Sequence, residues 1–196
     1  MEHATMTVVG VIAVSAIAVS VLFVSAQNRA DKEANLQQTT STSKPVAVAE
    51  LPDDIHKEIT RLSEEGNALQ EAGRLDEALS SFQRAEALLP PGNWEAGMWL
   101  LAAIGDVQFQ KKNFKESRTA FMDAVKYYDD AKGNAFIRMR LGQSMLELGE
   151  EKEAENWLAG AYLMLGKGLF IHEDPKYLLF VKSKLKPPKG GWPDGW

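Results

Sequence analysis

The sequence predicts an all-α protein in which helical hairpins repeat along the chain behind a single transmembrane helix. Three stretches of the chain align in one register on Gly66, Gly105 and Gly142. Each stretch holds two segments whose apolar residues recur at helical spacing. Ahead of them, an uncharged apolar run extends from Met6 to Ala26. Tandem helical units of this kind stack into an α-solenoid, because each unit buries its apolar face only against its neighbours.

The N-terminal run MTVVGVIAVSAIAVSVLFVSA is long enough to cross a membrane. As a helix rising about 1.5 Å per residue it would span about 30 Å, the thickness of the hydrocarbon core. Residues 1–26 are therefore predicted to be a transmembrane anchor, with residues 6–26 in the bilayer. A cleavable signal peptide is the alternative, since Val24-Ser25-Ala26 resembles a small-x-small cleavage site. A buried core helix is a further alternative, although such helices usually keep a polar face.

The charges around this run indicate an orientation. Arg29 and Lys32 follow the run, whereas no Lys or Arg precedes it. The positive-inside rule then predicts a single-pass membrane protein whose repeat domain is cytoplasmic. If residues 1–26 are instead removed, we expect a secreted or periplasmic protein.

Composition divides the rest of the chain. Residues 27–54 are rich in Gln, Thr and Ser and have little to bury, so they are predicted to form a flexible linker. At its end, Pro52-Asp53-Asp54 is typical of a helix start. Residues 55–186 hold the repeats and a capping helix. Residues 187–196 are too rich in Pro and Gly to be helical and are predicted to be an extended tail.

Small residues explain the register of the first repeat. Gly66 and Ala85 are predicted to let the two helices of the hairpin approach closely, while Phe82 fills the space beside them. Gly73 is predicted to end the first helix, because glycine takes the left-handed conformation without steric cost. The second helix then begins at Leu75.

This pattern over residues 55–166 resembles the tetratricopeptide repeat (TPR) family. The second repeat departs from the family pattern at Lys112, where a turn glycine is expected, and at Ser117, where alanine is usual. The third departs at Arg138, in place of a large apolar residue. The resemblance implies a TPR-type α-solenoid of three helical hairpins whose first helices line a concave groove. Residues 174–186 carry an apolar stripe and are predicted to cap the last hairpin.

The resemblance also implies which side chains face the groove. They are polar in the first repeat and form an aromatic and aliphatic patch in the second and third, as is common at binding hot spots. Two possibilities stay open: the patch is exposed to a partner, or the capping helix and the tail cover it. The candidate partner-binding residues are Asn67, Gln70, Trp99, Asp106, Phe109, Phe136, Met139, Arg140, Gln143 and Leu146.

Some family members hold the terminal carboxylate of a chaperone in a clamp of Lys, Asn and Arg. Asn67 and Arg140 match two clamp positions. Ser63, Phe136 and Ala103 stand where Lys, Lys and Asn are expected. Without those cations a carboxylate would lose its charge-assisted hydrogen bonds, so chaperone-tail binding is not predicted.

Other classes of function lack their signals. A net charge of −5 with no concentrated basic region argues against nucleic acid. There is no cysteine, and the three histidines are not paired at metal-ligand spacing, so no metal site is predicted. The absence of a phosphate loop and of a nucleophile elbow predicts no cofactor, no small-molecule substrate and no enzymatic activity.

The sequence therefore predicts a non-enzymatic, membrane-tethered adaptor that binds a protein or peptide partner in its concave groove. The alternative is an immunity-type inhibitor that neutralises one toxin or enzyme. That alternative follows from a second resemblance: repeats followed by EDPKYLLFVKSKL are similar to small bacterial stand-alone TPR proteins, some of them encoded beside toxin genes.

Overall fold

The structure, a computed structural model, describes residues 51–187 and 189–191. The predicted transmembrane anchor and nearly all of the predicted linker lie outside these residues, as does most of the tail. In the described part of the chain, no helix is both long enough and apolar enough to cross a bilayer. The regular elements of that part are all helical, which confirms the all-α prediction.

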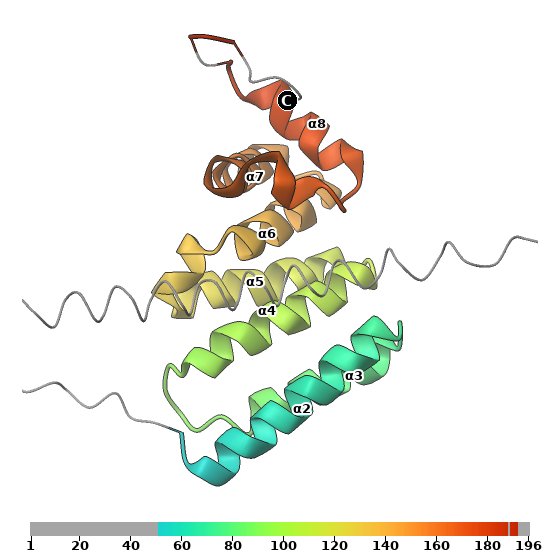
Figure 1. Ribbon diagram of the computed structural model, residues 1–196, viewed down its shortest axis with the longest axis vertical. Helices are drawn as coiled ribbons and strands as arrows, with labels where there is room; N and C mark the ends of the chain where they lie inside the picture. Colours follow the sequence, from blue (N-terminus) through green and yellow to red (C-terminus); the bar gives the residue numbers. More distant parts are fainter. Residues whose placement is uncertain (1–50, 188, 192–196) are drawn as a thin grey trace, which may run out of the picture. The chain divides into compact units, whose positions relative to one another are not determined.

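Six helices pair into three hairpins that stack in chain order (Figure 1). Neighbouring hairpins meet where the second helix of one packs against the first helix of the next. The hairpins are α2 (Asp53–Glu71) with α3 (Leu75–Ala87), α4 (Glu95–Gln110) with α5 (Phe114–Tyr127), and α6 (Ala135–Glu147) with α7 (Glu151–Leu165). The prediction of three hairpins is confirmed, and α2 begins at the acidic pair that predicted its start.

Three shorter elements complete the described chain. The 3₁₀ helix η1 (Asp129–Gly133) connects the second hairpin to the third, and η2 (Gly166–Phe170) follows α7. Helix α8 (Pro175–Lys184) then packs against α7, where a capping helix was predicted. Its start is fixed by Asp174, whose side chain accepts a hydrogen bond from the Lys176 backbone N–H at 2.9 Å.

The two helices of each hairpin cross at a glycine. A Cβ atom added to Gly66 would lie 2.6 Å from the Phe82 ring, and one added to Gly105 would lie 2.7 Å from the Phe121 ring. In the third hairpin, Gly142 meets Leu158 at 2.7 Å in the same way. Real Cβ atoms do not approach carbon this closely, so each crossing requires a residue without a side chain.

The turn between the helices repeats a left-handed backbone. Gly73 and Gly149 have φ angles of 72° and 77°, and Lys112 takes the equivalent position with φ at 62°. Lysine adopts this conformation at a steric cost that glycine avoids. The second turn therefore keeps the left-handed geometry of the other two turns, although lysine disfavours that conformation.

The two other departures from the family pattern are accommodated by polar contacts. Ser117 is fully buried, and its hydroxyl donates to the Gly105 carbonyl at 2.8 Å while lying 2.9 Å from the Ser144 hydroxyl. Arg138 lays its guanidinium over the Trp157 ring, 5.3 Å from its centroid. The arginine thus covers the apolar surface that a large aliphatic residue would otherwise cover.

We predict that Gly66→Ala or Gly105→Ala lowers the free energy of unfolding by about 1–3 kcal/mol, because the new methyl group forces the opposing phenyl ring out of place. Denaturant unfolding measures the change. Gly133→Ala is the matched control, since an added Cβ there meets nothing within 4 Å. Equal losses in the variant and the control would contradict the close-crossing argument.

We predict that Lys112→Gly raises the free energy of unfolding by about 0.5–1 kcal/mol, because relief of the left-handed backbone outweighs the extra entropy of the unfolded chain. Thermal unfolding of the variant tests this. Lys115→Gly, within α5, should instead destabilise the protein by about 1 kcal/mol. A loss of stability in both variants would show that the turn geometry at Lys112 carries no strain.

Candidate functional site on the first helices of the hairpins

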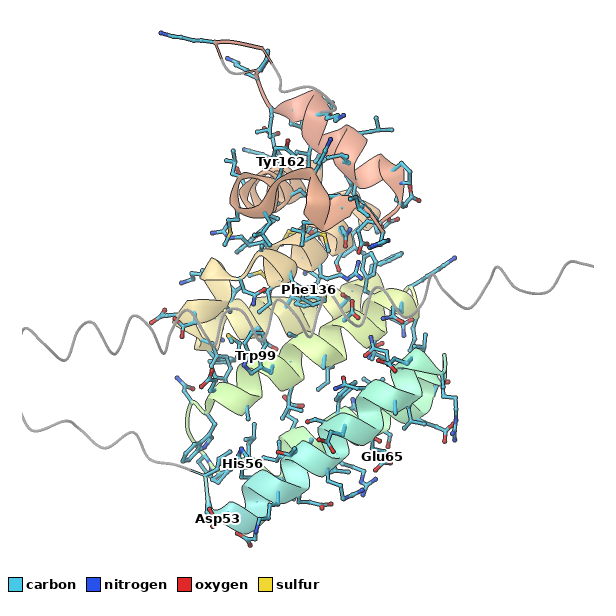
Figure 2. The ribbon with its side chains drawn as sticks, in the orientation of Figure 1. Asp53, His56, Glu65, Trp99, Phe136 and Tyr162 are labelled. Atoms are coloured by element: carbon cyan, nitrogen blue, oxygen red, sulfur yellow. The ribbon has the colours of Figure 1, made fainter. Side chains whose placement is uncertain are left out.

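Helices α2, α4 and α6 carry equivalent residues of the three repeats; Thr60, Trp99 and Phe136 stand at the same distance before the crossing glycine of each. Thr60 is exposed and the two aromatic side chains are half-buried; Figure 2 shows Trp99 on α4 and Phe136 on α6. Further along, Asn67 on α2 is exposed, whereas the equivalent Asp106 and Gln143 are buried. The candidate site is thus one face of three neighbouring helices, open at some rows and closed at others.

A buried arginine organises the closed part. The Arg140 side chain on α6 is only 4% exposed. Its Nε donates to Asp106 Oδ1 on α4 at 2.6 Å, and its Nη1 donates to Glu173 Oε2 at 2.5 Å. Burial alone would lower the pKa of the guanidinium, but the two carboxylates outweigh it and the pKa is raised. Arg140 is therefore charged and held between two anions.

Asp106 extends this network back to the first hairpin. Its Oδ2 accepts hydrogen bonds from Gln70 on α2 at 2.7 Å and from Gln110 on α4 at 2.8 Å. One carboxylate thus receives donors from all three first helices, Arg140 on α6 included. Because a buried carboxylate that loses its donors pays a large desolvation penalty, Asp106 holds α2, α4 and α6 in one arrangement.

Glu173 brings the C-terminal segment into the same network. It lies in the loop before α8, and its Oε2 accepts from Gln143 Nε2 at 3.0 Å as well as from Arg140. Four residues later, the Tyr177 hydroxyl donates to Glu147 Oε1 at 2.5 Å. Burial and this hydrogen bond raise the pKa of Tyr177, so it is a neutral donor. The C-terminal segment is therefore attached to α6 by three part-buried hydrogen bonds, to Arg140, Gln143 and Glu147.

Aromatic rings surround the arginine. The guanidinium lies 4.7 Å from the centroid of Phe109 and 5.4 Å from that of Phe136. The Phe109 ring also lies 6.3 Å from the ring of Tyr177 on α8. Stacking of this kind stabilises a desolvated cation. It also brings Tyr177 of the cap against Phe109 near the end of α4.

The structure therefore divides the predicted groove residues into three groups. Asn67 on α2 is exposed, and its neighbour Gln70 is half-buried with its amide bound to Asp106. Asp106, Arg140 and Gln143 are buried in the network, and Met139 is buried in the hydrophobic core. The half-buried aromatic and aliphatic residues that pack against that core are Trp99, Phe109, Phe136 and Leu146.

Among the described residues, the capping segment covers only part of the aromatic patch. The cap covers its Phe109 side through Glu173 and Tyr177, whereas Trp99 and Phe136 keep part of their surface. Arg140, one of the two clamp-like residues, already binds carboxylates of its own chain through Nε and Nη1. The Asn67 position is the only one of that pair with an exposed side chain.

Sequence reasoning did not assign Glu173, Gln110 or Tyr177 to the site. Glu173 directly precedes the predicted capping segment, and nothing in its local sequence pattern indicates a contact with α6. A signal was available on the other side: Asp106 and Arg140 sit within largely apolar helices, and buried charges require opposite charges nearby. Among the described side chains that are buried, none has an unsatisfied nitrogen or oxygen atom.

The described residues hold no group of three or more His, Asp or Glu side chains that could bind a metal ion. The buried acids are already neutralised by Arg140 and by amide donors. What this face offers is partly exposed aromatic surface beside polar side chains, a combination that is common at protein interfaces.

Comparisons with known proteins indicate the fold alone. No model of a protein family matches the sequence, and no curated protein matches it. Among solved structures, the chain is similar to the second TPR domain of the human RPAP3 protein, determined by NMR in complex with the HSP70 peptide SGPTIEEVD. The TM-score is 0.51 at 15% identity, and the match covers 67% of this chain and 98% of that domain. The fold of this protein is TPR-like.

We predict that Arg140→Leu lowers the free energy of unfolding by about 3–5 kcal/mol, because it strands two buried carboxylates without a counter-charge. Arg138→Leu is the matched control two residues away. That arginine lies on Trp157 outside the network, and its replacement should cost no more than about 1 kcal/mol. Denaturant unfolding of both variants checks the difference, and similar losses would rule out the network as the reason.

Proposed function

We propose that this protein is a non-enzymatic interaction module, held at a membrane by residues 6–26, that binds a peptide or short helix of a partner protein. The observation that carries the proposal is the row formed by Thr60, Trp99 and Phe136. These equivalent residues of three repeats each retain exposed surface. The structurally similar TPR domain of RPAP3 was solved with a bound peptide, which supports a peptide as the ligand.

The open rows define the chemistry of the partner. Trp99 and Phe136 offer aromatic surface for an apolar anchor, the type of contact that dominates binding energy at interfaces. Asn67 adds an exposed amide that can donate to and accept from peptide groups. The cation of this face, Arg140, is bound inside the chain. We therefore propose an apolar or amphipathic segment as the ligand rather than an acidic C-terminus.

The tether rests on the sequence. The run from Met6 to Ala26 carries no charge and has the length of a membrane span. The charges after it favour a cytoplasmic location for the repeats. Anchoring to a membrane raises the effective concentration of the module for any partner in the same bilayer, which suits a scaffold with one modest binding face.

A pull-down with blocking variants tests the binding face. The full chain carries a C-terminal tag and is crosslinked in membranes before purification. We expect Thr60→Arg/Asn67→Arg to lose the bound partner, because two bulky charges would fill the open rows without disturbing a buried contact. Trp99→Ala/Phe136→Ala should weaken capture about tenfold or more, as expected for hot-spot truncation.

The matched control is Gln83→Arg/Ala87→Arg, which adds the same charges to exposed positions of α3. It should retain the partner. A partner that is kept by the groove variants, or lost equally in the control, would contradict the assignment of this face. Intact mass of the same samples tests the tether separately, because a chain that starts near Gln27 would exclude the anchor.

A further inference from the structure

The end of the stack that is formed by α7, η2 and α8 differs in charge from the rest of the described chain. Residues 163–191 contain six lysines against two acidic residues, Glu173 and Asp174. Residues 53–162 contain thirteen Lys and Arg against twenty Asp and Glu. An otherwise acidic domain therefore has one basic end, and in Figure 1 this end lies opposite α2. Such an asymmetry indicates a surface that meets anions.

Apolar side chains are exposed on the same elements. Leu163, Ile171 and Leu179 are 75%, 68% and 63% exposed, more than any other large hydrophobic residue of the described chain. Met164 and Leu165 beside them are also exposed. Aliphatic side chains this open to water are costly. Ile171 and Leu179 line the same surface hollow, so their exposure marks an interaction surface rather than scattered exposure.

The lysines and the apolar side chains share one face of α8. Leu179 lies one turn from Lys176 and from Lys182, so these three side chains are neighbours on the helix surface. Leu179 and Lys182 also line a surface hollow of about 280 Å³ together with Ile171 and Leu178. Lys176 forms an ion pair with Glu147 at 2.5 Å, and Lys184 one with Glu151 at 3.7 Å. Over residues 163–191 the lysines still outnumber the acidic residues of the same segment.

We propose that this C-terminal end, the basic apolar surface of α7, η2 and α8, docks on an anionic lipid bilayer. Ile171 and Leu179 would enter the interfacial region while lysines contact anionic headgroups, the combination that peripheral membrane contacts require. Beyond α8, Lys186 and Lys189 are exposed and add positive charge. Acidic protein surfaces match the lysines but not the aliphatic side chains between them.

The chain contains no cysteine, so a single fluorophore can be attached at one introduced site. We would label Leu179→Cys in the full chain and reconstitute it into vesicles that carry a lipid-borne quencher. One set is phosphatidylcholine alone, and the other includes about 30% phosphatidylserine. The membrane segment is present in both sets, so neutral vesicles report the proximity that tethering alone produces. Leu88→Cys on the exposed surface beside α3 is the matched label site.

Docking predicts strong quenching at position 179 in anionic vesicles, little in neutral vesicles, and no difference between them at position 88. High salt should remove the effect, because at about 1 M the screening length falls to about 3 Å. Lys182→Gln/Lys186→Gln/Lys189→Gln should also abolish it. The control Lys57→Gln/Lys115→Gln/Lys152→Gln neutralises three exposed lysines elsewhere and should leave it unchanged.

Equal quenching in both vesicles, or none in either, would overturn the proposal. Capture of an acidic protein by the same lysines without quenching would also overturn it, in favour of a protein contact. Flotation of the chain with neutral vesicles shows whether residues 6–26 anchor it. Failure of the anchor is thereby distinguished from failure of the basic surface to bind the bilayer. The pull-down variants of Thr60 and Asn67 leave this surface intact, which keeps the two proposals independent.

Discussion

The architecture depends on the close approach of two helices within each hairpin. Gly66, Gly105 and Gly142 have no Cβ, and the ring or branched side chain of the partner helix occupies that space. This contact fixes the crossing point and therefore the angle at which each hairpin presents its first helix. Because the three crossings are equivalent, the first helices lie in parallel register, and equivalent residues of the repeats come into one row.

The rows differ in solvent exposure along the length of the first helices. Near the start of the first helices they stay partly open, with Trp99 and Phe136 as aromatic surface. Further along they close around Arg140, whose charge is balanced by Asp106 from within the solenoid and by Glu173 from the cap. A buried charge set of this kind is demanding about geometry, since each member loses its hydration on folding. It therefore holds α8 in one place and limits the open face to the part that the cap does not reach.

Both proposed surfaces, the binding face on the first helices and the basic apolar end at α8, could function at the surface of a membrane. Under the two proposals, residues 6–26 and the basic end would attach the chain to the same bilayer. Two weak attachments act as one stronger attachment when both can engage at once. The strength of that attachment would then depend on the lipid composition of the membrane.

The sequence by itself determined the repeats, their register and the special residues of each hairpin. Gly66, Gly73 and Ala85 are constrained by local geometry that recurs in every unit, so periodicity exposes them. It also determined that Trp99 and Phe136 are equivalent. Only the tertiary structure decided which rows remain open, because Glu173 reaches Arg140 from a loop that has no periodic relation to α6. The tertiary structure also decided that Met139 is buried and Leu179 exposed. Helical spacing identifies the apolar face of a helix but not the element that covers that face.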